Sequence, residues 1–221
     1  MLRSLLASTL RIPRPFNRTI STIRVFESTC SKSLALPLCF VSIKGWDKID
    51  SNAWKGWIYQ FAQKGYTSLL CEIDPESSSA KSASTSSDVL SSLENELLSL
   101  LRDPSASSPF PPLLFASSSS TLLAETYVSS HPLSGLVLHD PIPAPLANSS
   151  LPQAFPTKLD EFDYEPFFPV AVIQGEGEAE ECRLVREFGG EDEDALVRKL
   201  TGGRDEEGWN KVMEWMDENG L

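Results

Sequence analysis

Apolar residues gather in short runs that predict alternating strands and helices. Five runs of four to eight residues are rich in Val, Ile, Leu and Phe, and most are bounded by Pro or Gly, as buried strands are. They cover residues 38–43, 66–73, 113–116, 135–138 and 169–174. Because helical patterns separate most of these runs, we expect an α/β fold of three layers, with a doubly wound and mostly parallel sheet.

The segments between these runs carry apolar residues at the spacing of a helix. Trp54, Trp57 and Phe61 form one such face within residues 53–63, and Gly65 is expected to end that helix. Further helices are predicted over residues 88–101, 121–129, 179–188, 192–200 and 207–219. We therefore expect the carboxyl-terminal part of the chain to be helical, without a sixth strand.

Two segments lack this periodicity. Residues 76–87 are rich in serine, which predicts an exposed loop. Residues 141–168 contain six prolines and little regular pattern. A loop of this length in a compact domain is usually functional or the remnant of an insertion.

The amino end has a composition of its own. Residues 1–20 contain four arginines, several Ser and Thr, and no acid, which is typical of a mitochondrial presequence. The sequence Arg18-Thr19-Ile20-Ser21 resembles a matrix-protease site with cleavage after Ile20. We expect residues 1–20 to be removed, residues 21–221 to form one domain, and the protein to reside in the mitochondrial matrix. A disordered basic tail is the alternative interpretation.

Composition and charge exclude several classes of protein. The 221 residues carry a net charge of -12, which argues against general binding to nucleic acid or to anionic membranes, because both need a surplus of basic side chains. No apolar run approaches the roughly 18 residues that span a bilayer. The cysteines lack the spacing of a metal site and are expected to be buried thiols in a reducing compartment. They are Cys30, Cys39, Cys71 and Cys182.

An ordered series of motifs between residues 36 and 178 resembles the α/β-hydrolase family. The strand 113–116 leads through Ala116-Ser117-Ser118-Ser119-Ser120 into a helix, as at the nucleophile elbow of that family. The preceding Lys44-Gly45-Trp46 stands where the family has a strand ending in His-Gly, and residues 169–178 resemble the strand and turn that carry the triad acid. The resemblance implies a minimal α/β-hydrolase fold without a cap domain.

The resemblance also implies a set of site residues. They are Ser118 as the nucleophile, the backbone amides of Gly45, Trp46 and Ser119 as the oxyanion hole, and Glu178 or Asp140 as the acid. The elbow has Ala116 and Ser120 where the family has glycines, which suit its strained turn. No cofactor and no metal ion is expected.

The base of such a site is missing from its usual place. A serine hydroxyl needs a base within hydrogen-bond reach, which in this family follows the last strand, and no histidine follows Glu178. The two histidines of the chain are His131 and His139. Because neighbouring parallel strands lie about 5 Å apart, His139 could approach Ser118 with Asp140 or Glu178 nearby.

These observations leave three functions open. The first is a mitochondrial α/β-hydrolase-like protein with an incomplete triad, a pseudoenzyme that binds or assembles a mitochondrial protein partner. The second is a serine hydrolase that acts on a small ester, thioester or amide, an acyl ligand, through a rearranged Ser118 site. The third is a structural subunit of a larger complex that uses the acidic residues 178–221 as an interaction surface.

Overall fold

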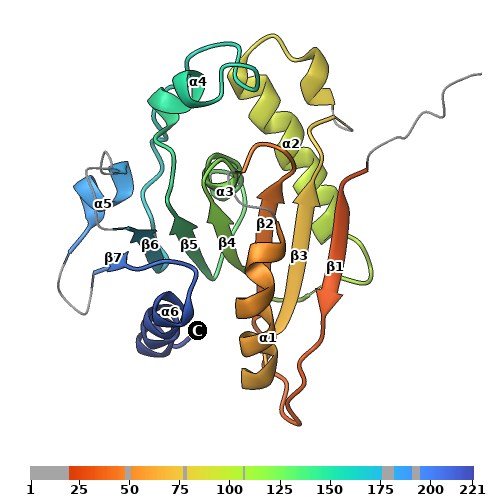
Figure 1. Ribbon diagram of the computed structural model, residues 1–221, viewed down its shortest axis with the longest axis vertical. Helices are drawn as coiled ribbons and strands as arrows, with labels where there is room; N and C mark the ends of the chain where they lie inside the picture. Colours follow the sequence, from red (N-terminus) through yellow and green to blue (C-terminus); the bar gives the residue numbers. More distant parts are fainter. Residues whose placement is uncertain (1–19, 48–50, 77–78, 107, 176–181, 191–194) are drawn as a thin grey trace, which may run out of the picture.

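The computed structural model describes residues 20–47, 51–76, 79–106, 108–175, 182–190 and 195–221 (Figure 1). Residues 1–19, which contain nearly all of the expected presequence, lie outside these ranges, as does Glu178. The cleavage after Ile20 therefore stays a prediction. Ser21, which would begin the cleaved chain, is buried, and its Oγ accepts a hydrogen bond from the amide of Asp74 (2.9 Å).

A seven-stranded sheet forms the centre of the described structure, in the order β1-β3-β2-β4-β5-β6-β7. Its parallel strands are β2 (Pro37–Ile43), β3 (Thr67–Ile73), β4 (Leu113–Ser117), β5 (Gly135–His139), β6 (Val170–Gln174) and β7 (Val197–Thr201). β1 (Thr22–Phe26) pairs antiparallel with β3 at one edge. The five strands predicted from the apolar runs are thus confirmed as β2 to β6, and the sheet is mostly parallel as expected.

Helices cover both faces of the sheet and make three layers (Figure 1). The longer helices are α1 (Lys55–Lys64), α2 (Ser86–Leu101), α3 (Ser120–Val128), α5 (Arg183–Phe188) and α6 (Glu206–Glu218). Short turns of helix are η1 (Ser51–Trp54), η2 (Ser79–Ser82), η3 (Ala144–Leu146) and α4 (Ala147–Ser150). α2 and α3 share a buried cluster with one face of the sheet, and α1 and α6 share another with the opposite face. None of the helices in the described ranges is long and apolar enough to span a membrane.

The alternating side chains of the strands fill these two clusters. On the face toward α1 and α6, the rings of Phe40 and Phe115 stack with centroids 4.4 Å apart, and Trp54 packs against both. On the other face, the thiols of Cys39 and Cys71 lie 3.8 Å apart between β2 and β3, both without exposure to solvent. Cys182 is also buried, but Cys30 is exposed, so the expectation that all four thiols are buried is wrong at Cys30.

The carboxyl-terminal part of the chain differs from the expectation. Residues 197–200 belong to β7, a sixth parallel strand beside β6, and not to a helix. Only Val197 is fully buried in this edge strand, so its sequence lacks the apolar run that marks the inner strands. β1 was not expected either. The proline-rich segment 141–168 is anchored by the buried side chains of Phe155 and Leu159.

Candidate active site

The chain makes a strained turn between β4 and α3, with Ser118 at its centre. Ser118 has a φ of +52°, a left-handed conformation that a side chain disfavours. Its amide donates to the carbonyl of His139 (3.0 Å), which ties the turn to the end of β5. The hydroxyl of Ser120 donates to the carbonyl of Ser117 (2.7 Å) and accepts from the amide of Ser117 (2.9 Å). The elbow geometry thus forms although Ala116 and Ser120 replace the glycines.

His139 ends β5 directly beside Ser117. Its side chain is 6% exposed, and both ring nitrogens are buried without a hydrogen-bond partner. Burial lowers the pKa of His139, while Asp140 opposes the shift. The Nδ1 atom lies 3.2 Å from Oδ2 of Asp140, but the contact is not a hydrogen bond. A neutral imidazole therefore sits at the strand end next to the elbow, without a hydrogen bond to the Ser118 hydroxyl.

Three residues expected around the oxyanion hole come together beside the elbow. Gly45 has a φ of +75° and turns the chain after β2. The amide of Trp46 donates to the carbonyl of Ile43 (3.2 Å), so this turn already uses it. The hydroxyl of Ser119 donates to the carbonyl of Trp46 (2.8 Å) and links the loop to the start of α3. The segment is therefore a hydrogen-bonded turn in which the Trp46 amide is engaged.

A carboxylate that the sequence reasoning missed joins the same turn to the elbow. Oδ1 of Asp47 accepts from the amide of Ser120 (2.8 Å), and Oδ2 accepts from the amide of Ile43 (2.7 Å) and the hydroxyl of Ser42 (3.0 Å). Burial raises the pKa of Asp47 to about 6, against the effect of these hydrogen bonds. Asp47 thus occupies the amino end of α3, where backbone amides and the helix dipole favour an anion.

Arg204 is the second residue that sequence reasoning missed. It lies in the loop 202–205 between β7 and α6, and its guanidinium carbon is 4.3 Å from the ring centre of Trp54. Its Nε and Nη1 atoms are buried without a hydrogen-bond partner. Burial lowers the pKa of Arg204, while Asp47 and Asp140 oppose the shift, and Arg204 in turn lowers the pKa of His139. Arg204 therefore interacts electrostatically with Asp47, Asp140 and His139 at the carboxyl ends of the strands.

The remaining candidates are placed as follows. Asp140 follows β5 with a φ of +46°, and its side chain is 59% exposed. Glu178 lies outside the described residues. His131 lies beyond the far end of α3, where its ring stacks on Tyr127 and its Nδ1 is 3.2 Å from Glu94 Oε1. Among the described residues no group of three or more His, Cys, Asp or Glu side chains is placed to hold a metal ion.

A second buried carboxylate lies on α3, away from the elbow. Burial and the neighbouring Glu161 raise the pKa of Glu125 to about 8, while Arg183 opposes the shift. The hydroxyl of Tyr164 donates to Glu125 Oε1 (3.4 Å). These contacts connect α3 to the segment 141–168, which the sequence pattern predicts to be a loop.

Solved structures of an esterase and of another α/β hydrolase are similar to this chain. The apo form of Thermogutta terrifontis esterase 2 is similar with a TM-score of 0.64 and 11% identity, over 94% of this chain and 92% of that one. MGS-MChE2, an α/β hydrolase from the metagenome of sediments of the lagoon of Mar Chica, Morocco, has a TM-score of 0.61 and 14% identity, over 91% of this chain and 96% of that one. No protein-family model and no curated protein matches the sequence.

The structural likeness agrees with the order of motifs in the sequence. It covers more than 90% of the chain and includes the seven-stranded, mostly parallel sheet with helices on both faces. At identities of 11% and 14% it concerns the fold and not the chemistry. The chain has the fold of the α/β-hydrolases.

Proposed function

We propose that this chain is a non-catalytic α/β-hydrolase-like protein that acts as a binding or assembly factor. The observation that carries the proposal is Arg204, which stands on the loop after the last strand, where the resemblance places the histidine base. A guanidinium stays protonated in proteins and cannot accept the proton of the Ser118 hydroxyl. The chain thus keeps the loop that should present a base but not the base.

Asp47 supports the same proposal. The tetrahedral intermediate of acyl transfer carries a negative charge that amides near the elbow must stabilise. Here the Asp47 carboxylate already accepts a hydrogen bond from the amide of Ser120 at the amino end of α3. Once Asp47 is ionised, a developing oxyanion nearby meets a like charge, which opposes the reaction.

A serine hydrolase acting on a small ester, thioester or amide is the second candidate. Two observations favour it: the strained φ of Ser118 is retained, and His139 beside it has two ring nitrogens without a partner. Strain of this kind is often kept at functional sites. This function requires a movement of the His139 ring toward the Ser118 hydroxyl, with Asp140 or Glu178 as the acid.

Labelling with a fluorophosphonate separates the two candidates. The purified chain, Ser118→Ala and His139→Ala are treated with the probe, and adducts are located by mass spectrometry. We expect no adduct on Ser118 of the folded protein, because no base activates it. Stoichiometric labelling of Ser118 that is lost in both variants would overturn the non-catalytic function and establish the hydrolase. Ser129→Ala, on the far end of α3, is the matched control.

We also propose that the protein acts in the mitochondrial matrix. The support is the acid-free, arginine-containing composition of residues 1–20. Residues 1–20 fused to a reporter should be imported into isolated mitochondria and cleaved after Ile20. A variant with the four arginines replaced by glutamine is the control and should stay outside. Cross-linking in mitochondria should then capture a stoichiometric protein partner.

A further inference from the structure

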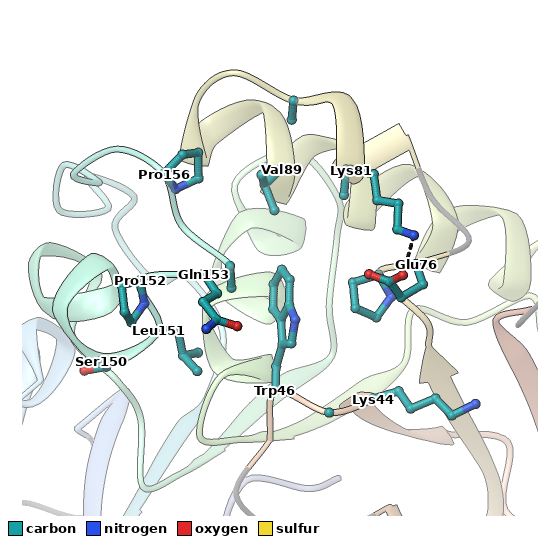
Figure 2. Close-up of a pocket in the computed structure, with 15 residues that line it drawn as sticks. Lys44, Trp46, Glu76, Lys81, Val89, Ser150, Leu151, Pro152, Gln153 and Pro156 are labelled. Carbon is teal, nitrogen blue, oxygen red and sulfur yellow. Dashed lines mark ion pairs between the residues drawn. The ribbon is translucent and has the colours of Figure 1, made fainter.

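A cavity of about 680 Å³ opens beside the elbow, at the carboxyl ends of β2 and β3 (Figure 2). Its walls come from the turn after β2, the segment after β3 with η2, the start of α2, and residues 150–156. Neither Ser118 nor His139 lines it. The volume lies within the range of roughly 300–1,000 Å³ that small-molecule sites occupy.

The walls of this cavity are fixed by hydrogen bonds. Ser86, at the start of α2, donates its amide to the hydroxyl of Thr157 (2.9 Å) and accepts the amide of Thr157 at its own Oγ (2.9 Å). Asn148 donates to the carbonyl of Phe155. These bonds hold the segment 150–156 against α2, so the cavity exists before any ligand arrives and little ordering is needed on binding.

Trp46 gives the cavity an aromatic surface. Its indole stands between residues 150–156 and the side chains after β3 (Figure 2). The ring packs edge-on against Phe155 at 5.4 Å, and the carbonyl of Trp46 accepts the hydroxyl of Ser119, which fixes its position. Most of the other apolar walls are small or rigid side chains: Pro75, Ala80, Ala83, Pro152, Ala154 and Pro156. Such walls suit a flat ring system that packs on the indole.

The charged groups around the cavity are already balanced. Lys81 forms an ion pair with Glu76 on one side of Trp46 (Figure 2). Lys44 lies 3.4 Å from Asp74, whose side chain is 4% exposed. A charged ligand would be attracted by one member of a pair and repelled by the other, and the net charge of -12 disfavours anions further. An uncharged ligand meets no such cost.

The pair Lys81–Glu76 offers a donor and an acceptor side by side. An ammonium donates and a carboxylate accepts, so a carboxamide fits both with its carbonyl and its N–H. The Gln153 side chain turns toward Trp46 from the opposite wall (Figure 2). We propose that this cavity binds a flat, uncharged aromatic molecule that carries a carboxamide or a similar donor–acceptor group. The proposal goes beyond the non-catalytic function and holds whether or not Ser118 reacts.

Three probes with the same ring test the chemistry. The full chain is titrated with 2-naphthamide, 2-naphthoate and 2-naphthylmethylammonium at pH 7, by calorimetry. We expect the amide to bind at least about fivefold more tightly than either charged probe. Absence of amide binding at millimolar concentration, or tighter binding of a charged probe, would overturn the proposal.

Variants locate the binding in the cavity. Ala83→Trp fills the space from a half-buried position and should abolish binding, while Trp46→Ala should weaken it about tenfold. Lys81→Met and Glu76→Gln should each weaken the amide about threefold. Lys158→Met, an exposed lysine outside the cavity, is the control and should bind normally. Circular dichroism checks that each variant is folded. If Trp46→Ala is unfolded, the loss of binding in Ala83→Trp alone tests whether the amide binds in this cavity. Unchanged binding by Ala83→Trp contradicts the site.

Discussion

The Ser118 elbow and the Arg204 loop both lie at the carboxyl ends of the parallel strands, yet they differ from the hydrolase pattern in opposite ways. The elbow keeps the backbone conformation with changed side chains, since Ser118 has a φ of +52° between Ala116 and Ser120. The loop 202–205 between β7 and α6 presents Arg204, where the proposed function expects the family's histidine base to be missing. Backbone geometry depends on many neighbours and persists through substitutions, whereas a base depends on one side chain.

Asp47→Ala should have the largest effect, because Asp47 supports the elbow from a second segment. Its removal leaves the amides of Ile43 and Ser120 and the hydroxyl of Ser42 without their acceptor. We expect a loss of about 3 kcal/mol in the free energy of unfolding, measured by urea denaturation. Asp160→Ala, an exposed acid, is the control. A loss below about 1 kcal/mol in the free energy of unfolding would mean that the elbow is stable without the hydrogen bonds of Asp47.

The pH dependence of stability tests the ionisation of Asp47. Its folded pKa of about 6 lies above its ordinary value of 3.8, so the folded state binds the proton more tightly and loses stability as pH rises from about 4 to 6. Asp47→Asn should remove that loss, which is about 3 kcal/mol for a shift of this size. Glu125 acts with the same sign up to about pH 8, so only the difference between the two proteins is interpreted. Parallel curves would contradict the raised pKa.

Ser118→Gly and Ser118→Ala measure the strain that the elbow retains. Glycine adopts a positive φ without the cost that a Cβ atom brings, so Ser118→Gly should be about 1 kcal/mol more stable than Ser118→Ala. Thermal and urea unfolding of both variants provide the comparison. Ser129→Gly against Ser129→Ala is the matched pair, because Ser129 ends α3 with a φ of -63° and should favour alanine. Equal stabilities at Ser118 would show that its conformation carries no strain.

Arg204→Met should change stability least, within about 0.5 kcal/mol at pH 5. The variant loses the contact with Trp54 but also removes buried nitrogens without partners, and these effects oppose each other. The pKa of His139 should rise, because Arg204 lowers it. Titration by NMR reads this shift, with His131 as the internal reference. A loss of stability well above about 0.5 kcal/mol would show that Arg204 stabilises the fold, contrary to this prediction.

The inner strands could be predicted because a strand that is buried on both faces has apolar residues at nearly every position. Val41, Leu114 and Val137 each belong to runs that are mostly apolar, and these runs form β2, β4 and β5. β7 could not be predicted in this way, since it pairs only with β6 and has Arg198 and Lys199 on its partly exposed surface. Acidic residues 191–194 followed by the basic Arg198 and Lys199 imitate the charge pattern of a helix. The strand forms because it pairs with β6, which is distant in the sequence.

The backbone turn of the candidate site was predictable only where a motif fixes it, and the roles of its residues stay predictions. Ser118 follows from the order strand, small residues, helix, and the structure gives it the expected turn. Asp47 and Arg204 belong to no motif, and their roles depend on segments brought together by the fold. The only local signal for Arg204 is Gly202-Gly203 before the helix cap Asp205. It marks the end of an element that the sequence pattern predicts as a helix and that the structure shows to be β7.

The four cysteines allow local opening of the chain to be measured by the rate at which each thiol is alkylated. A thiol reacts with an alkylating reagent only when solvent reaches it, so the rate of labelling counts openings of the structure around it. Cys30 is exposed and should react at once, and Cys182 should report movements near α5. Cys39 and Cys71, on the inner strands β2 and β3, should react only when these strands lose the helices that cover them or separate from each other. Four natural reporters thus distinguish fraying of an edge from loss of the whole fold.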